Sequence, residues 1–212
     1  MDDDLDISLF RHGLTKWNEK KAYIGSTDLP LSEKGKSCID VVTNEDYQIV
    51  FSSPMKRCLQ TTELLFPNRK PTIIPELKEI DFGTWEGKTY NELKNIQEYR
   101  NWLSYPYQYT PPYGESMNDF EKRVEKGWRD ITSMLCEKTY TKVAIMTHGG
   151  IIRQLLASLS QKPSSFFNWD VPPGGGYRLI WKNAKRKGGH TCTLLREVPI
   201  MEKLAGSKRF MD

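Results

Sequence analysis

The sequence of 212 residues contains few cysteines and no long apolar segment. Its 4 cysteines stand singly, without a CxxC pair, which excludes a zinc finger and the disulfide framework of a small secreted protein. No stretch approaches the roughly 18 apolar residues of a membrane-spanning helix. The chain opens on Met1 and several aspartates, not on the basic and apolar segments of a secretory signal. We therefore predict a cytoplasmic protein with free, mostly buried thiols and no membrane partner.

A strong excess of basic charge is also missing. Lysine and arginine number 31 against 27 aspartates and glutamates, so the formal net charge is +4, and the two signs are mixed along the chain. A nucleic-acid partner usually requires basic residues gathered in one stripe, and we predict none. Apolar residues make up 38% and charged residues 27%, which is typical of a folded protein. The length predicts a single domain spanning residues 1–212.

Short apolar segments alternate with amphipathic ones. Strands are predicted at 7–10, 48–52, 72–74, 142–147, 177–182 and 192–196, and helices at 32–44, 54–66, 89–102, 116–138 and 151–159. The alternation predicts an α/β fold, a three-layer α/β/α sandwich with a largely parallel central sheet. The last two strands are predicted to form a hairpin across the basic turn 185–189. In open sheets of this kind, ligands bind at the carboxyl ends of the strands.

Two of the 3 histidines stand at such ends. His12 follows the apolar segment 7–10, and His148 follows the apolar segment 142–147; each is followed by glycine, which lets the backbone turn sharply. Two strands of one parallel sheet would bring both imidazoles to the same edge. Either histidine by itself fits an ordinary packed residue, so their shared setting is what indicates a site.

Two arginines share this setting. Arg11 adjoins His12, and Arg57 lies in the first turn of the helix predicted after the strand at 48–52. Two guanidinium groups and two imidazoles at one edge would form an anion pocket suited to phosphate. The amides at the starts of the following helices would add donors.

Six segments together resemble the histidine phosphatase superfamily, which includes the cofactor-dependent phosphoglycerate mutases. They occur in the family's order over about residues 7–155. They read RHGLTKWN (11–18), GSTDLPLSEKG (25–35), SSPMKRCLQT (52–61), EIDFGTWEG (79–87), GES (114–116) and THGGIIR (147–153).

The resemblance implies a phosphatase fold and a reaction. His12 would be the nucleophile that becomes phosphohistidine, with its other ring nitrogen held by a fixed acceptor. Arg11, Arg57 and His148 would hold the phosphoryl oxygens, where charge gathers during transfer. Glu79 would be the general acid and base. Such a site requires no metal and no cofactor.

The resemblance also implies three further contacts to the substrate, from Asn18, Gly25 and Gly149. It selects Glu79 among the acids of its segment, because spacing alone does not distinguish it from its neighbours Glu76, Asp81 and Glu86.

The segment between Glu79 and His148 is shorter than in mutases of the family and has no paired arginines. A short lid insert at about 88–115 leaves the site open to water, which favours hydrolysis of a small-molecule phosphate monoester over phosphoglycerate mutase activity. The pattern most resembles the branch of α-ribazole phosphatases. The insert is rich in aromatic residues, which either stack on a ring-bearing substrate or pack on the core: Tyr99, Trp102, Tyr105, Tyr107, Tyr109 and Tyr113.

Three alternatives stay open. The chain could be a non-catalytic phosphate-binding regulatory module, although the intact set of catalytic residue types argues against it. A zinc hydrolase would use His12, His148 and His190, but no HxH or HExxH spacing supports it. A homodimer is also left open.

Overall fold

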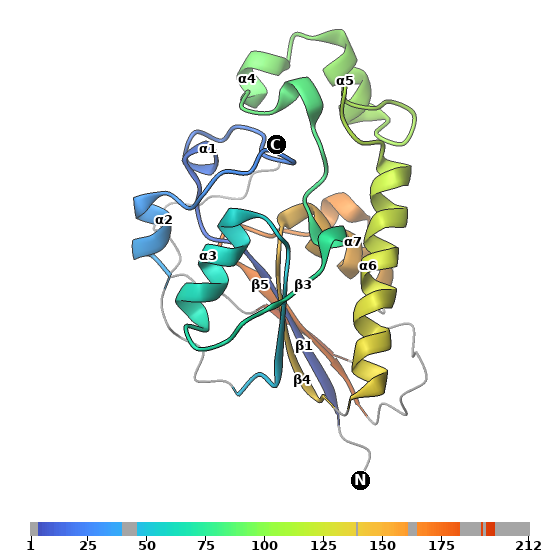
Figure 1. Cartoon of the computed structure of the whole chain (residues 1–212). Coiled ribbons are helices and arrows are strands. Elements are labelled where there is room, and N and C mark those ends of the chain that lie inside the picture. Colours follow the sequence, from blue (N-terminus) through green and yellow to red (C-terminus); the bar gives the residue numbers. More distant parts are fainter. Residues whose placement is uncertain are drawn as a thin grey trace.

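Six strands form one sheet in the part of the chain that the computed structural model describes, residues 4–39, 46–138, 140–160, 165–182, 192 and 194–197 (Figure 1). Their order is β3-β2-β4-β1-β5-β6. The strands are β1 (Leu5–Arg11), β2 (Ile49–Ser52), β3 (Thr72–Ile73), β4 (Lys142–Thr147), β5 (Gly176–Trp181) and β6 (Leu194–Glu197). The pairs β3-β2, β2-β4 and β4-β1 are parallel, whereas β5 is antiparallel to β1 and to β6. The predicted largely parallel sheet and its final antiparallel pair are confirmed.

Helices cover both faces of the sheet, as Figure 1 shows. On β1, Ile7 and Leu9 belong to a core shared with α6 (Met117–Glu137) and α7 (Gly149–Leu159). Phe10 belongs to a second core, which includes residues of α3 (Lys56–Leu65) on the opposite face. Alternation along the strand therefore sends successive side chains to opposite faces. The three-layer α/β/α sandwich is confirmed.

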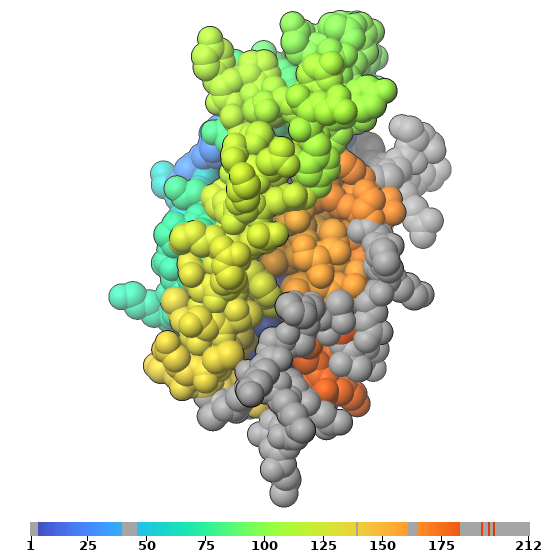
Figure 2. Space-filling view, turned by 90° about the vertical axis from the view of Figure 1, so that its right-hand side faces the viewer, coloured from blue at the N-terminus to red at the C-terminus, as the bar shows by residue number. Residues whose placement is uncertain are grey.

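The remaining helical segments lie near the carboxyl ends of the strands. They are α1 (Lys16–Glu19), α2 (Glu33–Ser37), α4 (Tyr90–Leu93), α5 (Gln97–Ser104), and the 3-10 turns η1 (Pro75–Leu77), η2 (Gly83–Trp85) and η3 (Phe166–Asn168). In the space-filling view the segment 88–115 forms the green upper end of the molecule, above α6 (Figure 2).

Two predicted helices differ from those observed. The helix expected over 32–44 is capped by Ser32 as predicted, but α2 ends at Ser37; residues 40–45 lie outside the described part of the chain.

The predicted hairpin turn at 185–189 and His190 also lie outside the described part of the chain.

The helix expected over 89–102 is divided into α4 and α5 by an extended Ile96. The packing of the segment gives the reason. Leu93, Tyr99 and Trp102 are buried in one cluster with Trp85, and Ile96 packs against it. Within the segment, the four positions Leu93, Ile96, Tyr99 and Trp102 follow one another at intervals of three residues. Each such step falls about 60° short of a full helical turn, so one straight helix could not direct all four side chains into the same cluster.

Two further expectations bear on the class of protein. No helix among the described residues is long and apolar enough to cross a lipid bilayer. None of the 4 cysteines is in a disulfide, but only Cys58 and Cys192 are buried, whereas Cys38 is half-buried and Cys136 is exposed.

Candidate active site

Three neighbouring parallel strands bring the two histidines and Arg57 together. In the register of β1 and β4, Arg11 lies beside Thr147, so the next residues, His12 and His148, leave the sheet side by side. Their ring centroids are 5.1 Å apart. Arg57 comes from the first turn of α3, which follows β2 on the other side of β4. The expected grouping at one sheet edge is thus present.

The imidazole of His12 is oriented by the backbone. Its Nδ1 lies 2.7 Å from the carbonyl oxygen of Gly13. A carbonyl can only accept, so Nδ1 carries the proton, and Nε2 of the neutral ring keeps its lone pair. Burial, followed by the charges of Arg57 and Arg11, holds the pKa of His12 well below its ordinary value of 6.5. The ring is therefore neutral at pH 7, as a nucleophile requires.

In His148 the proton is on the other ring nitrogen, Nε2, and not on Nδ1 as in His12. Arg57 Nε donates to its Nδ1 at 3.2 Å, so the proton of the neutral ring is on Nε2, which lies 2.8 Å from Ser53 Oγ. Burial lowers the pKa of His148 well below 6.5, and Arg57 and His12 lower it further. His148 is thus a neutral hydrogen-bond donor beside the neutral ring of His12, the predicted nucleophile.

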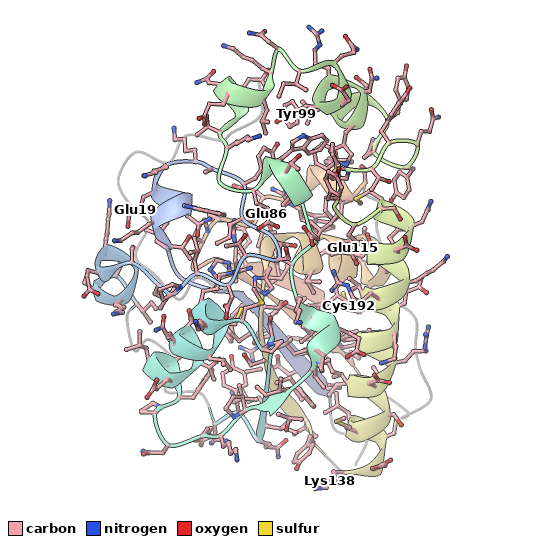
Figure 3. The ribbon with its side chains drawn as sticks, turned by 45° about the horizontal axis from the view of Figure 1, so that its top comes forward. Glu19, Glu86, Tyr99, Glu115, Lys138 and Cys192 are labelled. Atoms are coloured by element: carbon pink, nitrogen blue, oxygen red, sulfur yellow. The ribbon has the colours of Figure 1, made fainter. Side chains whose placement is uncertain are left out.

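Arg57 is buried and bound to the loop that contains Gly25. Its Nη2 donates to the Gly25 carbonyl at 2.7 Å, and its Nη1 donates to the Thr27 carbonyl at 2.8 Å. The Glu86 carboxylate holds the same loop by accepting from the amides of Ser26 and Thr27 at 2.7 and 2.8 Å. In Figure 3, Glu86 lies between the sheet edge and helix α5, which contains Tyr99.

The side chain of Arg11 lies against the start of α7. A Cβ at Gly149 would come 3.3 Å from the Arg11 Cζ, so a larger residue there would press on the guanidinium. Arg11 Nη1 donates to the Val171 carbonyl at 2.6 Å, whereas the buried Nε has no protein acceptor in the described structure. Burial lowers the pKa of Arg11 to about 10, and the nearby Glu79 carboxylate opposes this shift. Arg11 remains charged at pH 7.

Glu79 reaches the start of α7 as well. Its Oε2 accepts from the Gly150 amide at 2.9 Å, and its Oε1 accepts from the Ile80 amide at 3.0 Å. A Cβ at Gly150 would lie 2.3 Å from Glu79 Oε1, so glycine is needed for this approach. The carboxylate also neutralises part of the positive end of the helix dipole.

The neighbouring acids have other partners. Glu76 pairs with Lys126 on α6, Asp81 accepts from the Gly83 amide at 2.7 Å, and Glu86 holds the Ser26 loop. Geometry therefore separates Glu79 from the three acids that spacing could not exclude.

Asn18 is partly committed elsewhere. Its Oδ1 accepts from the amide and the hydroxyl of Thr15 at 3.1 and 3.0 Å, which forms the capping box at the start of α1. Only the Nδ2 group of Asn18 is left to donate to a substrate.

Gly25 packs directly on the acid loop (residues 76–87). A Cβ at this position would lie 2.0 Å from the Ile80 carbonyl oxygen, so only glycine allows this contact.

Metal-binding groups do not gather in the described structure. Among residues 4–39, 46–138, 140–160, 165–182, 192 and 194–197, no three histidine, cysteine, aspartate or glutamate side chains could hold one ion. The proposed zinc ligand His190 lies outside these residues, so that alternative and the expected independence of metals stay predictions.

The sequence profile of the histidine phosphatase superfamily, branch 1, matches residues 7–188, which are most of the chain. The chain belongs to this superfamily. The predicted enzyme class, a phosphoric monoester hydrolase of the superfamily, is confirmed.

Individual members of the superfamily agree with this. An adenosylcobalamin/alpha-ribazole phosphatase of Salmonella typhimurium is 29% identical over 175 residues, which cover 78% of this chain and 85% of the relative. Phosphoserine phosphatase 1 of Hydrogenobacter thermophilus is 27% identical, covering 72% of this chain and 75% of the relative. The crystal structure of the alpha-ribazole phosphatase from Shigella flexneri is similar with a TM-score of 0.73 and 25% identity, covering 86% of this chain and 92% of that chain.

Sequence reasoning missed several residues that hold the predicted catalytic groups in place. Ser53 accepts from His148, Glu86 organises the loop that binds Arg57, and Arg123 and Glu115 hold the acid loop. Ser53, Glu86 and Glu115 fall inside the matched segments, which was the available signal, but their roles depend on contacts between distant parts of the chain.

The aromatic residues of the insert divide into two groups. Tyr99 and Trp102 are buried in one cluster with Trp85 and Leu93, as the packing interpretation expected. The other tyrosines are exposed, with 42% of Tyr109 and 94% of Tyr113 accessible, so stacking on a substrate stays a prediction for these: Tyr105, Tyr107, Tyr109 and Tyr113.

Proposed function

We propose that the chain hydrolyses a small-molecule phosphate monoester through a phosphohistidine on His12. The observation that carries the proposal is the unprotonated Nε2 of His12 among hydrogen-bond donors that the protein leaves unpaired. These donors include the buried Arg11 Nε and one N–H on each Nη of Arg57. In the described structure the Gly149 amide at the start of α7 also donates to no protein acceptor.

The reaction has two steps. His12 Nε2 attacks phosphorus, the ester P–O bond breaks, and Glu79 gives its proton to the departing alkoxide. Water then attacks the phosphohistidine, Glu79 takes one of its protons, and the P–N bond breaks to leave inorganic phosphate. Arg11, Arg57 and the Gly149 amide would stabilise the charge on the equatorial oxygens in both steps. The Nε2–H of His148 would join them by turning from Ser53 Oγ to a phosphoryl oxygen.

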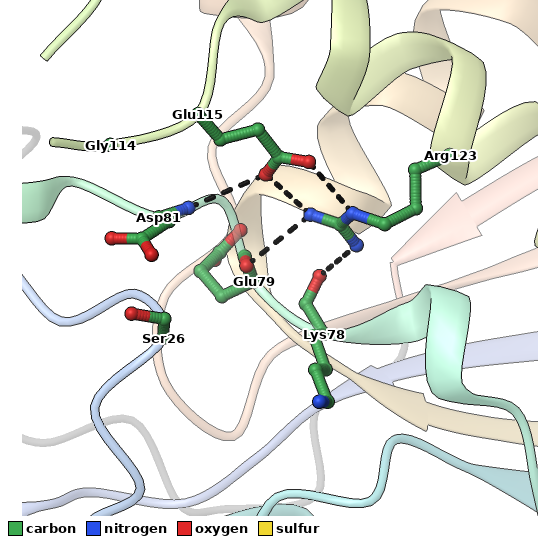
Figure 4. Close-up of a pocket in the computed structure, with 7 residues that line it drawn as sticks. All are labelled: Ser26, Lys78, Glu79, Asp81, Gly114, Glu115 and Arg123. Carbon is green, nitrogen blue, oxygen red and sulfur yellow. Dashed lines mark hydrogen bonds and ion pairs between the residues drawn. The ribbon is translucent and has the colours of Figure 1, made fainter.

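A cavity of about 370 Å³ beside Glu79 fits the leaving group. Glu79 lines it together with Ser26, Lys78, Asp81, Gly114, Glu115 and Arg123 (Figure 4). Because the acid must reach the leaving oxygen, the alcohol part of the substrate belongs on the side of Glu79 where this cavity lies. The names of the relatives make α-ribazole 5′-phosphate the first substrate to test, and phosphoserine the second.

The mutase alternative lacks the pair of arginines that mutases use for the carboxylate of a phosphoglycerate. Arg100 donates to Gln97 in the same helix, Arg129 pairs with Glu125, and all N–H groups of Arg123 are used by the protein. In the described insert, therefore, no arginine pair is available to bind such a substrate.

The remaining predictions concern the whole chain. We propose that residues 1–212 act as one domain, with residues 88–115 as a lid over the site. A cytoplasmic location and a homodimer stay predictions.

Hydrolysis in excess EDTA tests the function directly. We expect release of inorganic phosphate from p-nitrophenyl phosphate and a higher kcat/KM for α-ribazole 5′-phosphate or phosphoserine than for a phosphoglycerate. Isomerisation of the phosphoglycerate without phosphate release would support the mutase instead. Activity that is lost in EDTA and restored by zinc or magnesium would contradict the mechanism, and binding of phosphate without any turnover would indicate a regulatory module.

Glu79→Gln tests the acid. An alkoxide must be protonated as it leaves, whereas nitrophenolate leaves unaided, so the variant should slow a sugar phosphate by about 10²- to 10⁴-fold and p-nitrophenyl phosphate much less. The rate of the phosphorylation step is measured from the burst phase, because slow hydrolysis of the phosphoenzyme would reduce the steady-state turnover of both substrates alike. Glu86→Gln is not a suitable control, since Glu86 holds the Arg57 loop; Glu63→Gln on α3, which is exposed, is the matched variant. An unchanged burst with the sugar phosphate would remove Glu79 from this role.

A further inference from the structure

Arg123 on α6 makes an unusually complete set of hydrogen bonds beside the acid loop. Its Nε and Nη2 bind the two oxygens of the Glu115 carboxylate at 2.8 and 2.6 Å. Its Nη1 donates to the carbonyls of Glu76 and Lys78 at 2.7 and 2.8 Å, and its Nη2 also donates to the Glu79 carbonyl at 3.4 Å. A guanidinium has five N–H groups, so none is left for a substrate. Arg123 therefore acts on the protein itself.

The carbonyls that it binds belong to the backbone that presents Glu79. The fourth carbonyl of the same stretch, that of Leu77, accepts from Thr147 Oγ1 at 2.9 Å. Four consecutive carbonyls, at residues 76–79, are thus held by side chains of α6 and β4. Such a loop has little freedom to rotate its peptide groups, so the Cα of Glu79 has a defined position.

Glu115 continues this arrangement on the other side of Glu79. Its amide donates to the Asp81 carbonyl at 2.9 Å, and its Oε2 accepts from the Asp81 amide at 3.4 Å. The side chains of Arg123 and Glu115 are only 24% and 17% exposed, so water competes little for the pair. Figure 4 shows the guanidinium between the Glu115 carboxylate and the backbone at residues 78–79.

Helix α6 is a firm base for these contacts. It has 21 residues, and one turn beyond Arg123 it packs so closely on the acid loop that a Cβ at Gly127 would lie 2.7 Å from the Glu76 Cβ. Lys126 pairs with the Glu76 carboxylate at the same level. The first part of the acid loop is therefore attached to a long helix.

We propose that Arg123 and Glu115 are positioning residues, which hold the backbone of the acid loop so that Glu79 can transfer its proton. The proposal rests on the function proposed above, in which Glu79 is the general acid and base. The Glu79 carboxylate must remain within hydrogen-bond reach of the leaving oxygen, and a displacement of about 1 Å can cost about 100-fold in rate. The pair would thus control the step with poor leaving groups without touching the substrate.

The test compares two substrates in burst experiments. In Arg123→Met and in Glu115→Gln we expect phosphorylation by a sugar phosphate to fall about 10- to 100-fold, and phosphorylation by p-nitrophenyl phosphate to change by less than about threefold. Arg123→Lys, which keeps the charge but cannot form the fork, should show the same selectivity in weaker form. Arg129→Met is the matched control, because Arg129 lies on the same helix and its ion pair in the described structure is with exposed Glu125; it should show no selectivity.

A double-mutant cycle separates positioning from general damage. In the Glu79→Gln background, Arg123→Met should cause no further loss with the sugar phosphate, because the group that it positions is gone. Equal losses with both substrates, or a full additional loss in that background, would overturn the proposal. If Arg123→Met does not fold by circular dichroism, Arg123→Lys and Glu115→Gln decide the same question.

The two proposals fail in different ways. A Glu79→Gln variant that slows both substrates equally in the burst would overturn the acid role of Glu79, and with it the positioning role. A selective Glu79→Gln effect that neither Arg123→Met nor Glu115→Gln reproduces would overturn the positioning role alone.

Discussion

Replacement of His12 by alanine is expected to abolish both turnover and the trapping of labelled phosphate on the protein. The neutral Nε2 of His12 is the only described ring nitrogen of the pair that is free to attack, because the Nε2 of His148 carries a proton and its Nδ1 accepts from Arg57. Loss of a nucleophile typically costs at least about 10⁴-fold in kcat. Acid quenching after a short incubation with a labelled substrate measures the trapped phosphate.

His148→Asn is the control for this result. It removes the second imidazole of the site, but the nucleophile remains, so label should still accumulate on His12, only more slowly. Peptide mapping identifies the labelled residue. Label on any residue other than His12, or substantial turnover in His12→Ala, would contradict the phosphohistidine mechanism.

Substitution of Arg57 by lysine is expected to reduce kcat/KM by about 10²- to 10³-fold, even though the charge is kept. The three acceptors, which are the carbonyls of Gly25 and Thr27 and the Nδ1 of His148, are bound by three separate nitrogens of Arg57, and the single nitrogen of a lysine ammonium cannot occupy all three positions. The loop at 25–27 and the ring of His148 would both lose their support, and the phosphoryl oxygens would lose two aligned donors. Steady-state kinetics with p-nitrophenyl phosphate measures the effect.

The free energy of unfolding gives a second measure of the role of Arg57. Arg57→Met should also lower the free energy of unfolding by about 1–3 kcal/mol for each buried acceptor left unpaired, which urea denaturation measures. Lys56→Met is the matched control, because Lys56 is the exposed neighbour in the same helix turn, and it should leave both quantities nearly unchanged. Full activity in Arg57→Lys would show that only charge at this position matters.

The strand-end histidines show what the pattern of apolar residues in the sequence can predict. Short apolar segments followed by His-Gly predicted two parallel strands with a shared edge, and the pairing of β1 with β4 places His12 beside His148. The prediction succeeded because parallel strands in register must end together, whatever their connections. The segment 89–102 shows the limit, since its apolar positions indicated one helix while their common burial with Trp85 required two.

The sequence by itself determined the family, the layered α/β architecture and the residue types at the sheet edge, because these depend on local patterns and on segments in a definite order. Only the tertiary structure decided which nitrogen of His148 carries a proton, because the partners of this ring are an arginine and a serine brought to it by the fold. It also decided that Glu79, rather than a neighbouring acid, reaches the Gly150 amide. Such choices depend on hydrogen bonds between groups far apart in the chain, whose directions follow from packing and leave no periodic trace in the sequence.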